Sequence, residues 1–149
     1  MKHIYLDMNI YNRPHDDQMQ TRIKMETVAV FAILSNIRSG ELSLIWSFIV
    51  DYENSLNPDE AIRFEIEQLS ELASMYVLST DLVRQQAKSY EAKGIKPRDA
   101  LHVAAADVGG ADYFLTCDDR LLKKRYTLHL TLKMMNPIDF IREEGGRIA

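Results

Sequence analysis

The short run Ile4-Tyr5-Leu6 constrains the fold of this chain more than any other stretch. It is followed directly by an acidic residue, Asp7. The run is apolar without alternation, as is typical of a strand buried on both faces in the middle of a sheet. Such strands occur mainly in parallel sheets whose faces are covered by helices. We therefore interpret residues 2–6 as a central first strand, with Asp7 at its carboxyl end.

The rest of the chain alternates between strand-like and helix-like segments, which predicts an α/β fold with a parallel sheet. Further strands are expected over residues 42–46, 75–78, 113–115 and 133–137. Helices are expected over residues 20–38, 48–53, 58–73, 81–93, 97–108, 120–124 and 138–142. Residues 12–18 are interpreted as a loop and residues 126–132 as an alternating, exposed strand. Because no linker, repeat or low-complexity tract interrupts residues 1–149, we expect one domain.

Three further acids occupy positions comparable to that of Asp7. Asp99 lies just inside the alanine-rich helix, Asp118 follows the strand at 113–115, and Glu53 lies on the short helix after the strand at 42–46. In a parallel sheet the carboxyl ends of the strands and the neighbouring helix starts lie along one edge, where ligands bind. We therefore expect these four carboxylates to converge.

Four converging carboxylates need compensation. Two unit charges about 4 Å apart repel by roughly 4 kcal/mol at an effective dielectric constant of about 20. The four groups must therefore hold protons or a cation. Because no paired cysteines or histidines are available for a zinc site, a ligand set made of oxygen atoms favours Mg²⁺ or Mn²⁺.

The order of these motifs resembles the PIN-domain nucleases, including the VapC-like toxins. The motifs are Leu6-Asp7-Met8-Asn9, the helix from Ser47 to Glu53, Asp99-Ala100-Leu101-His102 with the alanines that follow, and Leu115-Thr116-Cys117-Asp118. The similarity extends from Met1 to about Phe140, and its second half is the most specific part. It implies a three-layer PIN-like fold with a mostly parallel central sheet flanked by helices.

The same resemblance implies a Mg²⁺- or Mn²⁺-dependent endoribonuclease. Its catalytic and metal-binding residues would be Asp7, Glu53, Asp99 and Asp118. Such proteins often are the toxin of a toxin–antitoxin pair or a free-standing RNA-processing enzyme, so an antitoxin partner and a homodimer are also expected. The reaction would use metal-activated water on single-stranded or looped RNA. The alternative is a non-catalytic RNA- or protein-binding module on the same fold, and the presence of all four acids favours the enzyme.

Each acid also has an interpretation without function. Asp7 would close a strand in an Asx-turn, Asp99 would interact favourably with a helix dipole, and Asp118 would cap the next helix. Asp119 is kept as an alternative to Asp118 or as a helper. Asp51 competes in the same way with Glu53 on its helix.

Several neighbours of the acids have expected roles of their own. Asn9 and Thr116 are suited to orienting a carboxylate or a metal-bound water. His102 has apolar neighbours, so we expect it to pack in the core or on the surface. Cys117 stands where a thiolate is disfavoured and is expected to be a filler. Tyr11 and Arg13 border the expected site and would meet a base or a phosphate.

The formal charge of −4 argues against a strongly basic protein that coats nucleic acid. A basic rim for RNA is still available in Arg13, Arg98, Arg120, Lys123, Lys124 and Arg125. A haloacid-dehalogenase phosphatase would need an acid where Asn9 stands, and a receiver domain would need an early acid pair. One cysteine indicates a reducing compartment. With no signal-like segment or spanning apolar run, we expect a cytoplasmic protein without a membrane role.

Overall fold

Residues 1–148 are described by the computed structural model, with side chains described as far as residue 145. In this range the strands are β1 (Lys2–Leu6), β2 (Leu42–Ser47), β3 (Ala73–Val77), β4 (Tyr113–Leu115) and β5 (Lys133–Met135). The helices are α1 (Met8–Asn12), α2 (Thr21–Arg38), α3 (Phe48–Ser55), α4 (Glu60–Leu69), α5 (Asp81–Glu91), α6 (Pro97–Val108), α7 (Asp119–Lys124) and α8 (Pro137–Ile148).

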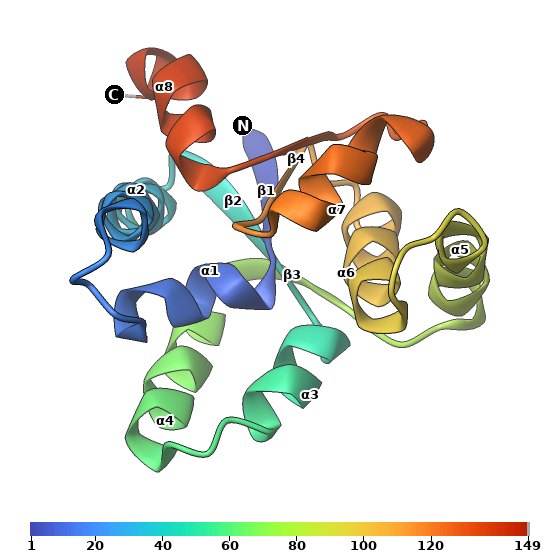
Figure 1. Cartoon of the computed structure of the whole chain (residues 1–149), viewed down its shortest axis with the longest axis horizontal. Helices are drawn as coiled ribbons and strands as arrows, with labels where there is room; N and C mark the ends of the chain where they lie inside the picture. Colours follow the sequence, from blue (N-terminus) through green and yellow to red (C-terminus); the bar gives the residue numbers. More distant parts are fainter. Residues whose placement is uncertain (149) are drawn as a thin grey trace.

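The five strands form one sheet in the order β3-β2-β1-β4-β5, and each pairing between neighbours is parallel. Helices α2 and α8 lie on one side of the sheet, and α5 and α6 lie on the other (Figure 1). The predicted three-layer α/β fold is therefore confirmed. Among the described residues, no helix is both long and apolar enough to cross a membrane.

The two central strands owe their position to unbroken apolar sequence. Ile4, Tyr5 and Leu6 of β1 have no exposed surface, and every residue of β2 is buried. Strand β1 pairs with β2 on one side and with β4 on the other, so both of its edges are covered. Edge strand β3, by contrast, exposes Met75 and Tyr76. The prediction of a central first strand is thus confirmed.

Helix α6 lies close to the sheet because its inward residues are small. Ala100, Ala104, Ala105 and Ala106 are fully buried. At the end of the helix, a Cβ atom on Gly109 would lie 2.9 Å from both the Ala105 carbonyl oxygen and a Val77 methyl group. Glycine is therefore required at this contact. Gly110 then takes a φ of 79°, which ends the helix as expected.

Several segments differ from the sequence-based expectation. One helix was expected over residues 58–73, but α4 ends at Leu69 and β3 begins at Ala73. Residues expected to form the 12–18 loop continue from α1 into a 3₁₀ helix at Arg13–His15, because Pro14 opens this turn. The segment 126–132 is not a strand: a 3₁₀ helix at Arg125–Thr127 is followed by a turn, with Leu128 and Leu132 buried in the core. The alternating leucines therefore anchor a turn. The last helix, expected at 138–142, extends over α8.

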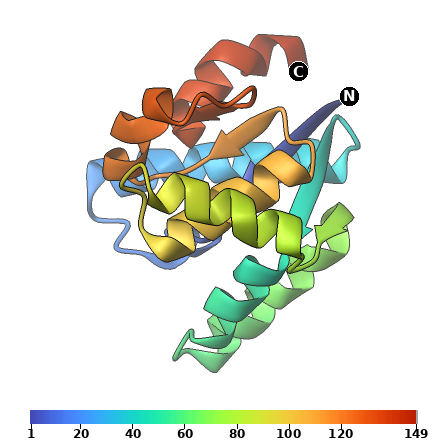
Figure 2. The ribbon, with the colours of Figure 1, turned by 90° about the vertical axis from the view of Figure 1, so that its right-hand side faces the viewer.

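Helices that follow the central strands start at the carboxyl edge of the sheet. Helix α1 follows β1, α3 follows β2, and α7 follows β4. In Figure 2, α5 and α6 cover the near face of the sheet, while α3 and α4 project beyond its edge. This arrangement brings four helix starts, including that of α6, to one end of the molecule.

Candidate functional site

Asp7 lies at the carboxyl edge of the sheet, between β1 and β4. Its backbone N–H donates to the Leu115 carbonyl at 3.0 Å, which continues the ladder by one residue. Its Oδ1 accepts the Met8 N–H at 2.8 Å and caps α1, so the interpretation as a structural cap holds for this oxygen. The residue is only 4% exposed. Burial raises the pKa of Asp7, and the negative charge of Glu53 adds to the shift, while His102 and Thr116 oppose it.

Asn9 and Thr116 hold the second oxygen of Asp7. The Thr116 hydroxyl donates to Oδ2 at 2.8 Å, and the Asn9 amide donates to the same atom at 3.2 Å. The Asn9 Oδ1 accepts the Cys117 N–H at 3.0 Å. The two residues predicted to orient a carboxylate therefore lie against Asp7, and they join the end of β1 to the β4–α7 connection.

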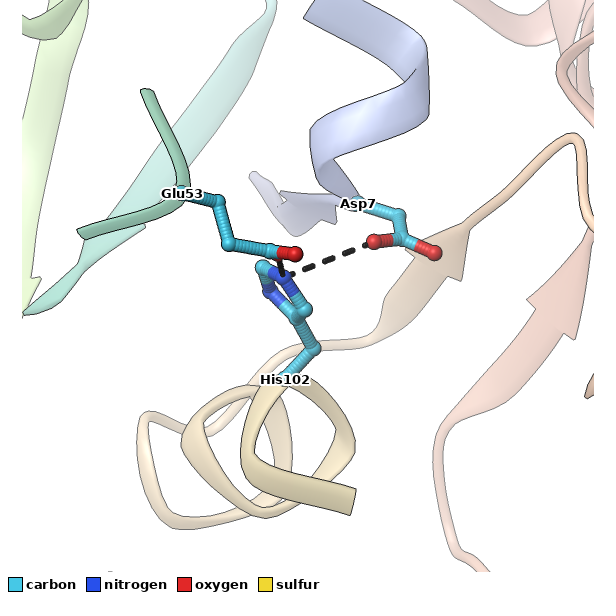
Figure 3. A group of neighbouring side chains, drawn as sticks. All are labelled: Asp7, Glu53 and His102. Atoms are coloured by element: carbon cyan, nitrogen blue, oxygen red, sulfur yellow. Dashed lines mark hydrogen bonds and ion pairs between the residues drawn. The ribbon is translucent and has the colours of Figure 1, made fainter. Parts of the chain in front are cut away.

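His102, which we expected only to pack, lies between two of the acids. It lies one helical turn after Asp99 and is 1% exposed. Its Nε2 contacts Glu53 Oε1 and lies 3.6 Å from Asp7 Oδ1 (Figure 3). Burial lowers the pKa of His102, but the carboxylates of Asp7 and Glu53 outweigh it, so the net shift is upward. Its spacing of three residues from Asp99 was the available signal, because residues i and i+3 share one helix face.

Glu53 points from α3 into this group, and Asp51 does not. Glu53 is 19% exposed, and its Oε2 lies 3.8 Å from Arg98 Nη1. Asp51 accepts hydrogen bonds from the Trp46 indole N–H at 2.8 Å and from the Tyr76 hydroxyl. Of the two candidates on this helix, Glu53 is the one brought to Asp7.

Asp99 and Asp118 complete the acid cluster. Burial raises the pKa of Asp99 to about 6, and the negative charges of Asp7, Asp118 and Glu53 contribute to the shift. Asp118 uses Oδ1 to accept the backbone N–H groups of Arg120 at 2.9 Å and of Leu121 at 3.4 Å, so it does cap α7. Asp99 and Asp118 line a small cavity of about 50 Å³.

Asp119 belongs to a different network and is not brought to the cluster. Its two oxygens accept a bidentate pair of hydrogen bonds from Arg22, both at 2.7 Å. Arg22 also lies 3.4 Å from the buried carboxylate of Glu26, which accepts a hydrogen bond from Asn136 at 2.6 Å. Arg13 points to the same carboxylate, with its Nε 3.3 Å from Glu26 Oε1.

The remaining neighbours face the interior. Tyr11 packs on Trp46 with ring centroids 4.8 Å apart, and Arg13 is held by Asp16 and the Glu26 network. Neither side chain is presented to the acids. Burial raises the pKa of Cys117 to about 12, which disfavours a thiolate as expected.

A groove of about 340 Å³ opens beside Glu53. Met8, Asn12 and Pro58 line it together with Arg98, whose guanidinium lies 5.5 Å from the centre of the Tyr52 ring. A larger cavity of about 580 Å³ lies beside β5 and α8, and its lining includes none of the four acids. Volume alone would favour the larger cavity, but Glu53, one of the four acids, lines the smaller groove.

The chemistry of the cluster suits a divalent cation. One ligand atom each from Asp7, Glu53 and His102 lie within 4.8 Å of one another. Asp99 adds a carboxyl group whose pKa is raised first by burial and then by the negative charges of Asp7 and Asp118, while His102 opposes the shift. Mutually repelling carboxylates in a partly buried site are relieved when a cation binds. The residues present therefore fit a divalent metal ion.

The family model of the PIN domain matches residues 4–126. No curated protein matches the chain. Among solved structures, a chain of VapBC-1 from nontypeable Haemophilus influenzae is 17% identical with a TM-score of 0.57, and the match covers 91% of this chain and 98% of that one. A chain of VapBC2 from Rickettsia felis, bound to a DNA fragment from the promoter, is 15% identical with a TM-score of 0.54, covering 90% and 98%. At these identities the likeness establishes a shared fold.

Proposed function

Since the chain belongs to the PIN domain family, we propose that it is a metal-dependent endoribonuclease that hydrolyses RNA phosphodiester bonds. The proposal is supported by the close group of Asp7, Glu53 and His102 at the carboxyl edge of the sheet. Beside it, the pKa of Asp99 is raised to about 6 by burial and by the charges of Asp7, Asp118 and Glu53. Keeping such groups together costs free energy, which a purely structural role would not require. A bound cation removes this repulsion, and the free energy released adds to its binding affinity.

Asp7, Glu53, Asp99 and Asp118 would hold Mg²⁺ or Mn²⁺. When bound, the metal lowers the pKa of a coordinated water and stabilises the charged oxygens of an in-line displacement. The protein's own part is orientation. Thr116 and Asn9 fix the plane of the Asp7 carboxylate, and the hydrogen bonds to Asp118 Oδ1 fix the direction of that side chain.

Positive side chains on both sides of the acids support an RNA substrate. Arg98 lines the groove beside Glu53, and Arg120 and Lys124 line the cavity beside Asp118. A guanidinium binds a phosphate through paired hydrogen bonds, and the exposed Tyr52 ring next to Arg98 offers a surface for stacking a base. Single-stranded or looped RNA fits best because its bases are available for stacking.

We further propose that the chain is the toxin of a toxin–antitoxin pair and forms a homodimer. Its fold is shared with VapBC structures, one of which was determined with promoter DNA. Helix α2 exposes Met25, Val28 and Phe31, each by more than half of its surface. Apolar surface of this kind is typical of protein interfaces. A non-catalytic binding module on the same fold is the alternative, and the measurement of RNA cleavage separates the two.

The test is to incubate the purified protein with a pool of cellular RNAs and different ions. We expect cleavage with Mg²⁺ or Mn²⁺, none in chelator, and none with Ca²⁺, whose larger radius and looser geometry misplace the attacking water. Asp99→Asn should abolish cleavage, whereas Asp119→Asn is the matched control and should retain it. Full activity in chelator, or an inactive wild type with every ion, would refute the proposal.

A further inference from the structure

We propose that His102 is a positioning residue: a proton kept on its Nε2 holds Glu53 and Asp7 facing each other, and the buried pair Ser47 and Tyr5 determines where that proton lies. The inference rests on the proposed function in one respect, namely that these two carboxylates bind the metal. The position of the proton itself does not depend on metal binding.

The geometry places His102 where a donor would act on both carboxylates. Figure 3 shows its ring between Glu53 and Asp7, with Nε2 directed at both side chains. The ring is 1% exposed, so water does not replace these contacts. A donor here brings together two like-charged groups that would otherwise separate.

Two buried hydroxyl groups, those of Tyr5 and Ser47, are hydrogen-bonded in series behind the His102 ring. The Tyr5 hydroxyl lies 2.7 Å from His102 Nδ1 and 2.7 Å from Ser47 Oγ. The Ser47 oxygen also accepts the Val50 N–H at 3.5 Å as the cap of α3. Tyr5 and Ser47 have no exposed surface, so their protons must be donated within the protein.

The available donors and acceptors favour one direction of donation along the hydrogen bonds from Ser47 through Tyr5 to His102. Within the described part of the protein, Tyr5 is the hydrogen-bond acceptor that the structure offers to the Ser47 hydroxyl proton. In the neutral imidazole, Tyr5 then donates its own proton to His102 Nδ1, which leaves the ring proton on Nε2, facing Glu53. In the opposite direction the Ser47 proton would be buried without an acceptor, which is unfavourable.

Tyr5 is suited to this task because it is fixed and keeps its proton. Its ring stacks on Phe114 with centroids 5.4 Å apart and an interplanar angle of 10°. Burial raises the pKa of Tyr5 far above the ordinary value, so the hydroxyl remains a donor. The histidine is therefore oriented from the core of the sheet.

The competing role for His102 is direct ligation of the metal. Ligation would need the lone pair of Nε2, and a ligating histidine usually donates its other ring N–H to an acceptor. The direction of the Ser47–Tyr5 chain opposes this arrangement. If Nε2 keeps its proton, the ligands are oxygen atoms alone, which matches the preference of Mg²⁺.

The first experiment is long-range ¹H–¹⁵N NMR of the histidine rings in the full-length wild type, without metal and with Mg²⁺ added. The His102 signals are assigned by their loss in His102→Gln. We expect Nε2 to carry a proton in both states. An Nε2 without a proton in the metal-free protein, or one that loses its proton as Mg²⁺ is added, would overturn the proposal.

The second experiment measures Mn²⁺ affinity by calorimetry, with folding checked by circular dichroism. Loss of a partner behind a metal ligand typically weakens affinity about 10–100-fold, so we expect this for His102→Leu. His102→Gln keeps an N–H donor and should recover much of the loss, while Tyr5→Phe should weaken binding less. Asp119→Asn is the matched control and should bind as the wild type does.

Tighter binding by His102→Leu than by the wild type would show that the ring competes with the metal, and it would refute the positioning role. If His102→Leu does not fold, the Mn²⁺ affinity of Tyr5→Phe and the wild-type NMR test the positioning role instead. If the wild type binds neither Mg²⁺ nor Mn²⁺, the proposed function fails, while the NMR still tests the location of the proton.

Discussion

Replacing Asp99 by asparagine should stabilise the metal-free protein at neutral pH. The pKa of this carboxyl group is raised from 3.8 to about 6, first by burial and then by Asp7 and Asp118. Each pKa unit corresponds to about 1.4 kcal/mol, so the full shift is worth about 3 kcal/mol. Because the group is partly exposed, solvent screening reduces this to about 1–2 kcal/mol. Asparagine removes the charge and with it this cost.

The sign of the pH dependence follows from the direction of the shift. A carboxyl group that holds its proton more tightly when folded gives a stabilisation that is complete below pH 3.8 and is lost as the pH rises through about 6. Asp7 and His102 also have raised pKa values, so they act in the same direction. The metal-free wild type should therefore lose stability between pH 5 and pH 7.5, and Asp99→Asn should lose less.

The assay is thermal unfolding in chelator from pH 5 to pH 8. In a protein of this size, 1 kcal/mol shifts the melting temperature by about 2–4 °C, so Asp99→Asn should melt roughly 3–6 °C higher at pH 7.5, with a smaller gap at pH 5. Asp119→Asn is the control: its pKa is lowered by Arg22, so its effect should not vary over this range. Mn²⁺ at about 100 times its Kd should add about 2.7 kcal/mol to the wild type and less to Asp99→Asn.

If the metal-free wild type and Asp99→Asn melt together throughout pH 5–8, and Mn²⁺ moves neither, the four acids do not form one electrostatic unit. If the wild type instead has the higher melting temperature at pH 7.5, Asp99 stabilises the metal-free protein, and the predicted sign of its contribution is wrong.

Three further outcomes are expected. Asp118→Asn should reduce RNA cleavage by orders of magnitude while asparagine keeps the cap on α7, whereas Asp119→Asn should have a small effect; the reverse ranking in a cleavage assay would assign the wrong residue. Glu26→Gln should lower the free energy of unfolding in urea by about 1–2 kcal/mol, because Arg13 loses a buried ionic partner while Arg22 keeps Asp119; an unchanged or higher free energy of unfolding would contradict this. Sedimentation at micromolar concentration should show a dimer, and a protein that remains monomeric would count against the homodimer.

The sequence by itself determined the layers of the fold and the positions of the four acids along the chain. Unbroken apolar runs such as residues 4–6 require burial on both faces, and Gly110 can end a helix because it accepts a positive φ. Whether an acid follows a strand or opens a helix is a local property of the chain. The parallel sheet then brings such positions to one edge, which is why Asp7 and Asp118 could be predicted together.

Only the tertiary structure decided what each side chain contacts. Tyr5 and His102 are 97 residues apart, as are Arg22 and Asp119, and no local pattern specifies either pair. The leucines of 126–132 alternate as in a strand, yet burial of Leu128 and Leu132 fixes a turn. Side-chain direction depends on packing between elements that are distant in sequence. For this reason the sequence identified the acids, while the position of the histidine between them became visible only in the folded protein.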